Sequence, residues 1–277
     1  MSEAFHFLAE FIDSVLPDAL ARRQGREPAF VLISGPQGSG KTFNAAQLLA
    51  HVAQQHRAVG LSIDDFYLPA GAQAAVAAGG NPLLAGRGLP GTHDVPLLRD
   101  TLARLRKGEG EVELPQYDKA AHGGRGDRCA ARVRVQLPVD VVILEGWFLG
   151  FEPAAEAELA RAAGTYGAAA LREVNAALED YSACLWRAAG VPSVGIVFDA
   201  QVRECVARWR IQQEHELRER CGAGMTDAQV HAFLERYLVC YDVYYARLVR
   251  EGLGNLHRLT VGLDGDRKVT YVSQKNM

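Results

Sequence analysis

The feature that most constrains this chain is a glycine-rich segment that ends in lysine and threonine. Residues 35–42 read Gly-Pro-Gln-Gly-Ser-Gly-Lys-Thr and match the pattern G-x-x-x-x-G-K-[ST] at every fixed position. Five consecutive apolar residues, 29–33, come just before it, and a segment of helical composition, 42–56, follows it. A buried strand, a glycine-rich turn and a helix in this order predict a loop that holds the phosphates of a nucleotide.

Each residue type in this loop has a physical reason to contact phosphate. Glycine lets the backbone turn so that successive N–H groups point inward, and the N-terminus of the following helix adds partial positive charge. We expect the Lys41 ammonium to reach the β- and γ-phosphates, and the Thr42 hydroxyl to join the shell of a Mg²⁺ ion. ATP and Mg²⁺ are therefore the expected cofactors. The expected nucleotide-binding residues are Gly35, Pro36, Gln37, Gly38, Ser39, Gly40, Lys41 and Thr42.

Composition and charge exclude several classes of function. The chain has 277 residues, 48% of them hydrophobic and 23% charged, as in ordinary globular proteins. The chain has 30 Lys and Arg residues and 33 Asp and Glu residues, so its net charge is −3. With this charge, no nucleic-acid or membrane partner is expected. The five scattered cysteines form no C-x-x-C pair, which indicates reduced thiols and a cytoplasmic location. The expected oligomeric state is a monomer or a weak homodimer.

Apolar runs that alternate with helical segments predict an α/β fold. We expect a mainly parallel sheet flanked by helices in three layers. The expected buried strands are at 29–33, 59–63, 139–144 and 194–198. The spacing of apolar residues also predicts an amphipathic helix within 1–24. Since neither a repeat nor a linker is evident, the whole chain, 1–277, is predicted to be a single domain.

The segments between the central strands carry weaker local signals. Residues 69–91 are rich in glycine, alanine and proline, and we expect them to form a long irregular loop. Asp94 stands where the N-cap of the next helix should be, and that helix is expected to reach about residue 107. A short strand is expected at 111–114.

The second half of the chain is predicted to be largely helical. A helical insert is expected at about 153–190, and the charged segment at about 201–226 is expected to be a helical lid. Gly222 and Gly224 are expected to break the lid helix, after which a capping box at Thr226 opens another helix that extends to about residue 250. The tail, 256–272, alternates like a hairpin around an Asp-Gly turn.

Three carboxylates at the ends of predicted strands are candidates for chemistry. Asp64 and Asp65 close the second strand, where a carboxylate can accept the proton of an attacking hydroxyl, although either could instead cap a turn. Glu145 follows the strand at 139–144, at the Walker B position, and could hold Mg²⁺ directly or through water. We predict Asp64 as the catalytic base, Lys41 as a catalytic cation, and Thr42 and Glu145 as metal ligands.

A second glycine-rich segment, 117–128, contains several basic residues. Lys119, Arg125 and Arg128 stand there beside Tyr117. Charge-assisted donors of this kind suit a small carboxylate, whereas a nucleoside would favour aromatic stacking and amide donors. The alternative for each basic residue is a solvated surface charge. The loop therefore favours a small acidic hydroxy compound as substrate.

Several sequence blocks, in this order, carry a family resemblance. They are 35–42, 61–68 (Leu-Ser-Ile-Asp-Asp-Phe-Tyr-Leu), 87–94 (Arg-Gly-Leu-Pro-Gly-Thr-His-Asp), 115–119 (Pro-Gln-Tyr-Asp-Lys), 123–128 (Gly-Gly-Arg-Gly-Asp-Arg) and 144–151 (Leu-Glu-Gly-Trp-Phe-Leu-Gly-Phe). Together they resemble the plant- and fungal-type D-glycerate 3-kinases, and more distantly uridine kinase, phosphoribulokinase and bacterial pantothenate kinase. The resemblance implies a three-layer P-loop NTPase fold with a helical lid.

The same resemblance implies a reaction and a set of site residues. The γ-phosphoryl group of ATP would pass to a hydroxyl of D-glycerate and give 3-phosphoglycerate. Asp64 would be the base, and Arg208 and Arg210 would close over the transferred group. The residues implied to face the acceptor are Asp65, Tyr67, Arg87, His93, Asp94, Tyr117, Lys119, Arg125 and Arg128. Otherwise His93 would be a hydrogen-bonding loop residue, and Asp94 could be the N-cap, the acceptor contact or both.

Two other functions remain open from the residues themselves. The first is a kinase for another hydroxy acid, for pantothenate or for a nucleoside. The second is a nucleotide-dependent switch ATPase with no small substrate. The sequence has no N-K-x-D motif, which disfavours a GTPase, and its net charge disfavours an ATPase that acts on nucleic acid.

Overall fold

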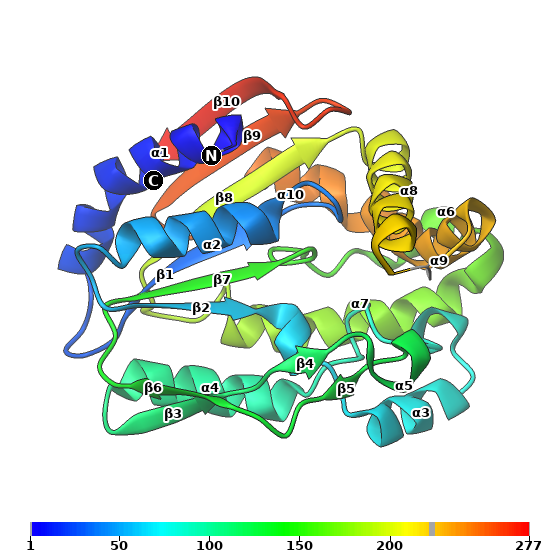
Figure 1. The fold of residues 1–277 in the computed structure, drawn as a ribbon, viewed down its shortest axis with the longest axis horizontal. Coiled ribbons are helices and arrows are strands. Elements are labelled where there is room, and N and C mark those ends of the chain that lie inside the picture. Colours follow the sequence, from blue (N-terminus) through cyan, green and yellow to red (C-terminus); the bar gives the residue numbers. More distant parts are fainter. Residues whose placement is uncertain (1, 222–224, 277) are drawn as a thin grey trace.

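The core of the molecule is a six-stranded, mainly parallel sheet (Figure 1). In the computed structural model of the chain, the described residues are 2–221 and 225–276. In spatial order the strands are β10 (Val269–Asn276), β9 (His257–Leu263), β8 (Ser193–Ala200), β1 (Ala29–Ser34), β7 (Val141–Gly146) and β2 (Ala58–Ser62). Only β10 runs antiparallel to its neighbour, β9. The predicted α/β class with a mainly parallel sheet is confirmed.

Two apolar cores lie on opposite faces of this sheet because successive residues of a strand point in opposite directions. In β1, Phe30 and Leu32 enter one core. Val31 and Ile33 enter the other. The helices that cover the two faces are α1 (Glu3–Ala21) and α2 (Lys41–Val52) on one side, and α4 (Val95–Lys107) and α7 (Gly167–Cys184) on the other (Figure 1). The expected three layers follow from this arrangement.

A smaller lobe continues beyond β2 and is built around two short antiparallel ribbons. One pairs β3 (Glu111–Leu114) with β6 (Val133–Gln136), and the other pairs β4 (Tyr117–Asp118) with β5 (Asp127–Arg128). The strand predicted at 111–114 is thus confirmed, but it belongs to a ribbon rather than to the central sheet. The β4–β5 ribbon frames the short helix α5 (Ala121–Gly124), so the basic loop is anchored at both ends.

The segment 69–91 differs from the irregular loop expected for it. It contains the helix α3 (Ala70–Ala78) and a 3₁₀ turn at Pro82–Leu84. The residues of α3 are mostly alanine, which has the highest intrinsic helix propensity. Alanine content therefore outweighs the flanking proline and glycines that suggested a loop.

The predicted helical insert at 153–190 holds α6 (Glu156–Ala162) and α7. The lid segment contains α8 (Val202–Cys221). The expected break at Gly222 and Gly224 lies outside the described residues. Among the helices of 2–221 and 225–276, none combines the length and apolarity needed to cross a membrane.

The helix predicted from Thr226 is α9 (Asp227–Cys240), and its capping box is present: Gln229 N donates to the Thr226 side chain at 3.3 Å. The helical path continues through a π-helical turn, Tyr241–Tyr245, into α10 (Ala246–Glu251). The hairpin predicted for the tail is formed by β9 and β10.

Candidate active site

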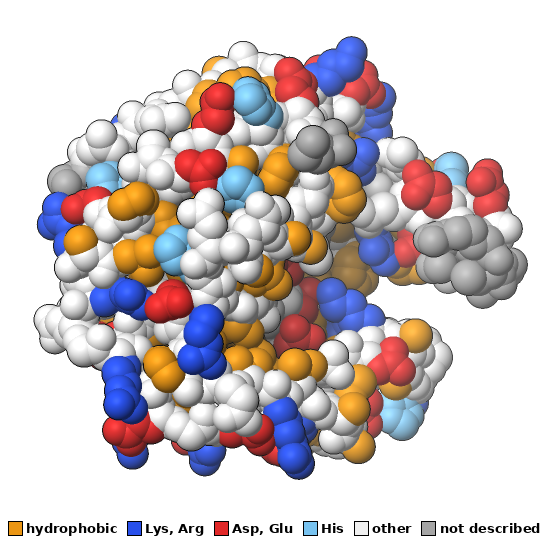
Figure 2. Space-filling model, turned by 60° about the vertical axis from the view of Figure 1, so that its left-hand side comes forward, with side chains coloured by type: hydrophobic (Ala, Val, Ile, Leu, Met, Phe, Trp, Pro, Cys, Tyr) orange, Lys and Arg blue, Asp and Glu red, His pale blue; other side chains and the backbone are white. Residues whose placement is uncertain are grey.

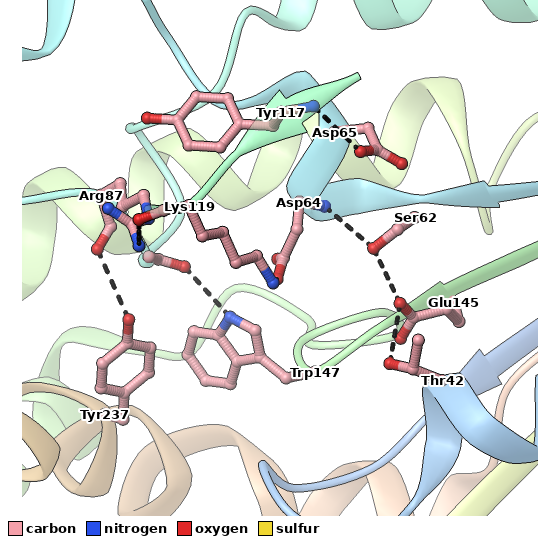
Figure 3. Close-up of polar contacts among 11 residues, drawn as sticks. Thr42, Ser62, Asp64, Asp65, Arg87, Tyr117, Lys119, Glu145, Trp147 and Tyr237 are labelled. Carbon is pink, nitrogen blue, oxygen red and sulfur yellow. Dashed lines mark hydrogen bonds and ion pairs between the residues drawn. The ribbon is translucent and has the colours of Figure 1, made fainter. Parts of the chain in front are cut away.

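The candidate site lies where β1, β7 and β2 end side by side. These three parallel strands are neighbours, and their register places Ser34 opposite Gly146 and Ser62 opposite Glu145. Carboxyl ends of parallel strands meet at one edge of a sheet, so the loop after β1 and the carboxylates after β2 and β7 converge there. Figure 3 shows Thr42, Glu145, Ser62 and Asp64 in a row at this edge.

The glycine-rich loop has the backbone that its sequence predicts. Gly38 and Gly40 have φ values of 81° and 83°, in the left-handed region that favours glycine. Close neighbours leave no room for larger residues, because a Cβ on Gly38 would lie 2.5 Å from the Cβ of Trp209 on α8. The hydroxyl of Ser39 is buried and has no hydrogen-bond partner among the described residues. An inward-facing hydroxyl and turned glycines fit a bound polyphosphate.

Residues distant in sequence hold the outer side of this loop. The Tyr241 hydroxyl donates to Gln37 Oε1 at 2.6 Å and accepts from Gln37 N at 3.1 Å. Arg267, in the β9–β10 turn, donates from Nε to the Gly38 carbonyl at 2.6 Å and lies 5.1 Å above the Trp209 ring. Sequence reasoning missed both Tyr241 and Arg267, since no local motif marks them.

A candidate cation site lies at Glu145, whose carboxylate accepts hydrogen bonds from two hydroxyls. Glu145 Oε1 accepts from Thr42 Oγ1 at 3.2 Å and from Ser62 Oγ at 2.7 Å. The other oxygen of Glu145, Oε2, is buried and has no partner among the described residues. Oxygen ligands with an unshared carboxylate oxygen suit Mg²⁺, so the predicted ligands Thr42 and Glu145 fit the ion. Ser62 was not predicted, although it precedes the acidic pair by two residues.

Asp64 projects toward the centre of the site from a 3₁₀ turn, Ile63–Phe66, that follows β2. Its Oδ2 lies 2.6 Å from the Nζ atom of Lys119 (Figure 3). Burial would raise the pKa of Asp64, but the charge of Lys119, its hydrogen bond and the charge of Lys41 together hold that pKa below the usual value. Asp64 is therefore an ionised carboxylate in direct contact with a cation, opposite the phosphate loop.

The neighbouring carboxylate has a different environment. Asp65 accepts a hydrogen bond from Tyr117 N at 3.3 Å, which ties β4 to the end of β2. Burial raises the pKa of Asp65, and the charge of Asp64 adds to this rise. The two consecutive carboxylates thus have different partners: Asp65 contacts the backbone of Tyr117, and Asp64 contacts the ammonium of Lys119.

Two arginines predicted to face the acceptor brace the loop that carries Lys119. Arg87 donates from Nη2 to the Lys119 carbonyl at 3.1 Å and from Nη1 to the Gly124 and Arg125 carbonyls. Arg128 donates to Asp94 Oδ2 at 3.0 Å, and Asp94 Oδ1 caps α4 by accepting from the N–H group of Leu97. Asp94 therefore does act as the N-cap. Arg125 is exposed and donates to the His122 carbonyl.

Several aromatic side chains pack together among the residues predicted to face the acceptor. His93 stacks on Tyr67 with ring centroids 4.3 Å apart, and its Nδ1 lies 3.0 Å from the Tyr181 hydroxyl. Burial lowers the pKa of His93 to about 3, so the ring is neutral near neutral pH. The Tyr67 ring is also 5.3 Å from the Tyr117 ring. Trp147, not predicted as a site residue, lies beneath Lys119 (Figure 3) and donates to the Gly88 carbonyl at 3.0 Å.

The two lid arginines occupy different places. Arg210 pairs with Glu214 and lies 5.7 Å from the Phe233 ring of α9. Arg208 pairs with Asp266 in the β9–β10 turn, at 2.5 Å. The structure therefore does not bring these arginines together. Beneath the end of the α8–α9 pair, Figure 2 shows a deep notch with charged side chains of both signs on its floor.

A phosphate loop, a site for a hard cation and an ionised carboxylate at one sheet edge define a class of protein, the P-loop kinases. The chain is 42% identical over 275 residues to Probable ATP-dependent kinase TDA10 of Saccharomyces cerevisiae, which covers 95% of this chain and 93% of that protein. It is 37% identical over 234 residues to chloroplastic D-glycerate 3-kinase of Arabidopsis thaliana, across 81% of this chain and 49% of that protein.

A solved structure gives the same relationship. D-glycerate 3-kinase from Cryptococcus neoformans var. grubii superposes with a TM-score of 0.87 at 30% identity, over 99% of this chain and 100% of that one. No family model matches the chain. By sequence and by fold, the chain belongs to the family of P-loop kinases that includes TDA10 and D-glycerate 3-kinase.

Proposed function

We propose that this protein transfers the γ-phosphoryl group of ATP to a hydroxyl of D-glycerate and forms 3-phosphoglycerate. The observation that carries the proposal is the contact between Asp64 and Lys119 opposite the phosphate loop, because it sets a proton acceptor beside a cation suited to a carboxylate. The names of two relatives, both D-glycerate 3-kinases, support the same acceptor.

In this mechanism the chain's own residues position the reactants and move one proton. The amides of the phosphate loop and Lys41 hold the β- and γ-phosphates. The acceptor oxygen attacks the γ-phosphorus, its proton passes to Asp64, and ADP departs. Arg210, which lies over the Phe233 ring of α9, would bring a positive charge to the transferred group on lid closure.

Thr42 and Glu145 would hold Mg²⁺, with Ser62 orienting the carboxylate. When bound, the ion neutralises charge on the phosphate oxygens. The acceptor would lie among Tyr67, His93, Tyr117, Lys119 and Arg125. The backbone and side chains around these residues are held in place by hydrogen bonds of Asp65, Arg87, Asp94 and Arg128.

Two alternatives are tested by the same assay. A kinase for another hydroxy acid, for pantothenate or for a nucleoside would use the same phosphate loop with a different acceptor. A switch ATPase would turn over ATP without any acceptor. The ion pair at Asp64 favours an anionic acceptor over a nucleoside and over ATP turnover without an acceptor.

The experiment is ADP release from Mg·ATP with a panel of acceptors: D-glycerate, L-glycerate, pantothenate, uridine and ribulose 5-phosphate. We expect stimulation by D-glycerate, with 3-phosphoglycerate as the product. Stimulation by another acceptor alone would retain the kinase and replace its substrate. Slow ATP turnover that no acceptor accelerates would favour the switch ATPase.

A further inference from the structure

Lys119 places its ammonium on one carboxylate oxygen of Asp64, the proposed base. Its Nζ is 2.6 Å from Asp64 Oδ2, a short charge-assisted hydrogen bond. A hydroxyl or a water molecule that approaches this oxygen has to displace the ammonium. Without an acceptor, Lys119 therefore blocks Oδ2 of Asp64.

The contact between Lys119 and Asp64 can break without movement of the backbone. The Lys119 carbonyl is held by Arg87, so the backbone is fixed at this point. The side chain beyond it is 58% exposed, whereas that of Asp64 is 25% exposed. A lysine side chain has several rotatable bonds, so its ammonium can move while the loop stays in place. Figure 3 shows that side chain extended across Trp147 to reach Asp64.

An acceptor with a carboxylate has what is needed to move the ammonium, since a second anion competes for it. Water and neutral alcohols carry no such charge. A molecule whose carboxylate binds the Lys119 ammonium while its hydroxyl contacts Asp64 would satisfy both groups. Lys119 thus selects the charge of the acceptor.

We propose that Lys119 blocks Oδ2 of Asp64 until the carboxylate of a hydroxy acid draws its ammonium away, so that the base is freed only by an acidic acceptor. This inference rests on the proposed function and names the residue that couples acceptor binding to base release. Without an acceptor, the blocked base limits hydrolysis of ATP, in which water oxygen attacks the γ-phosphorus, Asp64 takes the water proton, and ADP leaves. Lys119 then both recognises the acid and suppresses this side reaction.

The test compares Lys119→Met, which keeps the length and removes the charge, with Lys119→Arg, which keeps the charge. ATP hydrolysis without acceptor is expected to rise at least tenfold in Lys119→Met and to stay within severalfold of the original in Lys119→Arg. The increase should vanish in the double variant Lys119→Met with Asp64→Asn. Lys107→Met, at an exposed lysine of α4 that pairs with Glu109, is the matched control and should leave hydrolysis unchanged.

A second readout uses D-glycerate and glycerol, which share a carbon chain and differ in the carboxylate. The preference of the original protein for D-glycerate, as kcat/KM, should fall at least tenfold in Lys119→Met, with the KM for ATP unchanged. Hydrolysis that is equal or lower in Lys119→Met would overturn the inference. If the original protein phosphorylates neither compound, the proposed function is wrong, and the hydrolysis comparison still decides whether Lys119 blocks Asp64.

Discussion

Trp209 lies over Gly38 so closely that a methyl group at position 38 would stand 2.5 Å from the Trp209 Cβ. Because Gly38 also has a φ of 81°, Gly38→Ala should both strain the backbone and push α8 off the phosphate loop. We expect ATP to bind at least about tenfold more weakly, or about 1.4 kcal/mol, by titration calorimetry. Gly71→Ala, in α3 with open space around it, is the control. If Gly38→Ala binds ATP as tightly as the original protein, the phosphate loop tolerates the displacement of α8.

Removal of the Asp64 carboxylate should separate binding from chemistry. Asp64→Asn keeps the size of the side chain but cannot accept the proton, so turnover should fall by about 10²- to 10⁴-fold. ATP affinity should change little, because Asp64 lies on the acceptor side. Parallel calorimetry and single-turnover assays measure the two effects. Retained turnover would move the role of base to Asp65 or to solvent.

The hydroxyl of Ser62 orients Glu145, so its loss should be seen in the Mg²⁺ dependence of the reaction. Ser62→Ala is expected to raise the Mg²⁺ concentration for half-maximal activity by roughly 10- to 100-fold, as for other residues that orient metal ligands. Ser14→Ala removes an exposed hydroxyl of α1 and should leave that concentration unchanged. An unaltered Mg²⁺ requirement in Ser62→Ala would mean that Glu145 needs no such partner.

Acid should destabilise the fold through His93. Burial lowers its pKa to about 3, whereas an unfolded histidine titrates near 6.5, so between these values the unfolded chain binds more protons. The stability that neutral His93 contributes is complete above about pH 6.5 and declines as the pH falls toward 3, by up to about 1.4 kcal/mol per pH unit.

Urea unfolding at a series of pH values from neutral to about 5 would measure this slope. His93→Asn should flatten it, and His6→Asn, at an exposed histidine, should not. If the slope is the same in His93→Asn, another group is responsible for the acid sensitivity.

The phosphate loop and the strands around it could be predicted because their signals are local. Five apolar residues before a glycine-rich turn specify β1 and its loop without reference to any distant residue. The same holds for Asp94, whose side chain caps the helix that starts one residue later. The error at 69–91 arose where two local signals competed, alanine content against flanking glycine and proline.

The connections that shape the site could not be predicted in this way, because they join residues far apart in sequence. Arg87 reaches a carbonyl 37 residues away, and Arg128 reaches a carboxylate 34 residues away. The family resemblance implied that Arg87 faces the acceptor, and the basic loop suggested the same for Arg128. An arginine looks the same in sequence whether it faces a ligand, a carboxylate or a backbone carbonyl. Tyr241 is 204 residues from the loop that it supports, and no spacing rule covers that distance.

The hydrogen bond from Arg267 to Gly38 has a consequence for how the protein is made. The two residues are 229 positions apart, so the phosphate loop leaves the ribosome well before its brace. At typical elongation rates the loop waits for roughly 10 to 50 s. A nascent chain cannot finish its nucleotide site during that interval, and tight retention of ATP would therefore mark a polypeptide that has been extended past Arg267.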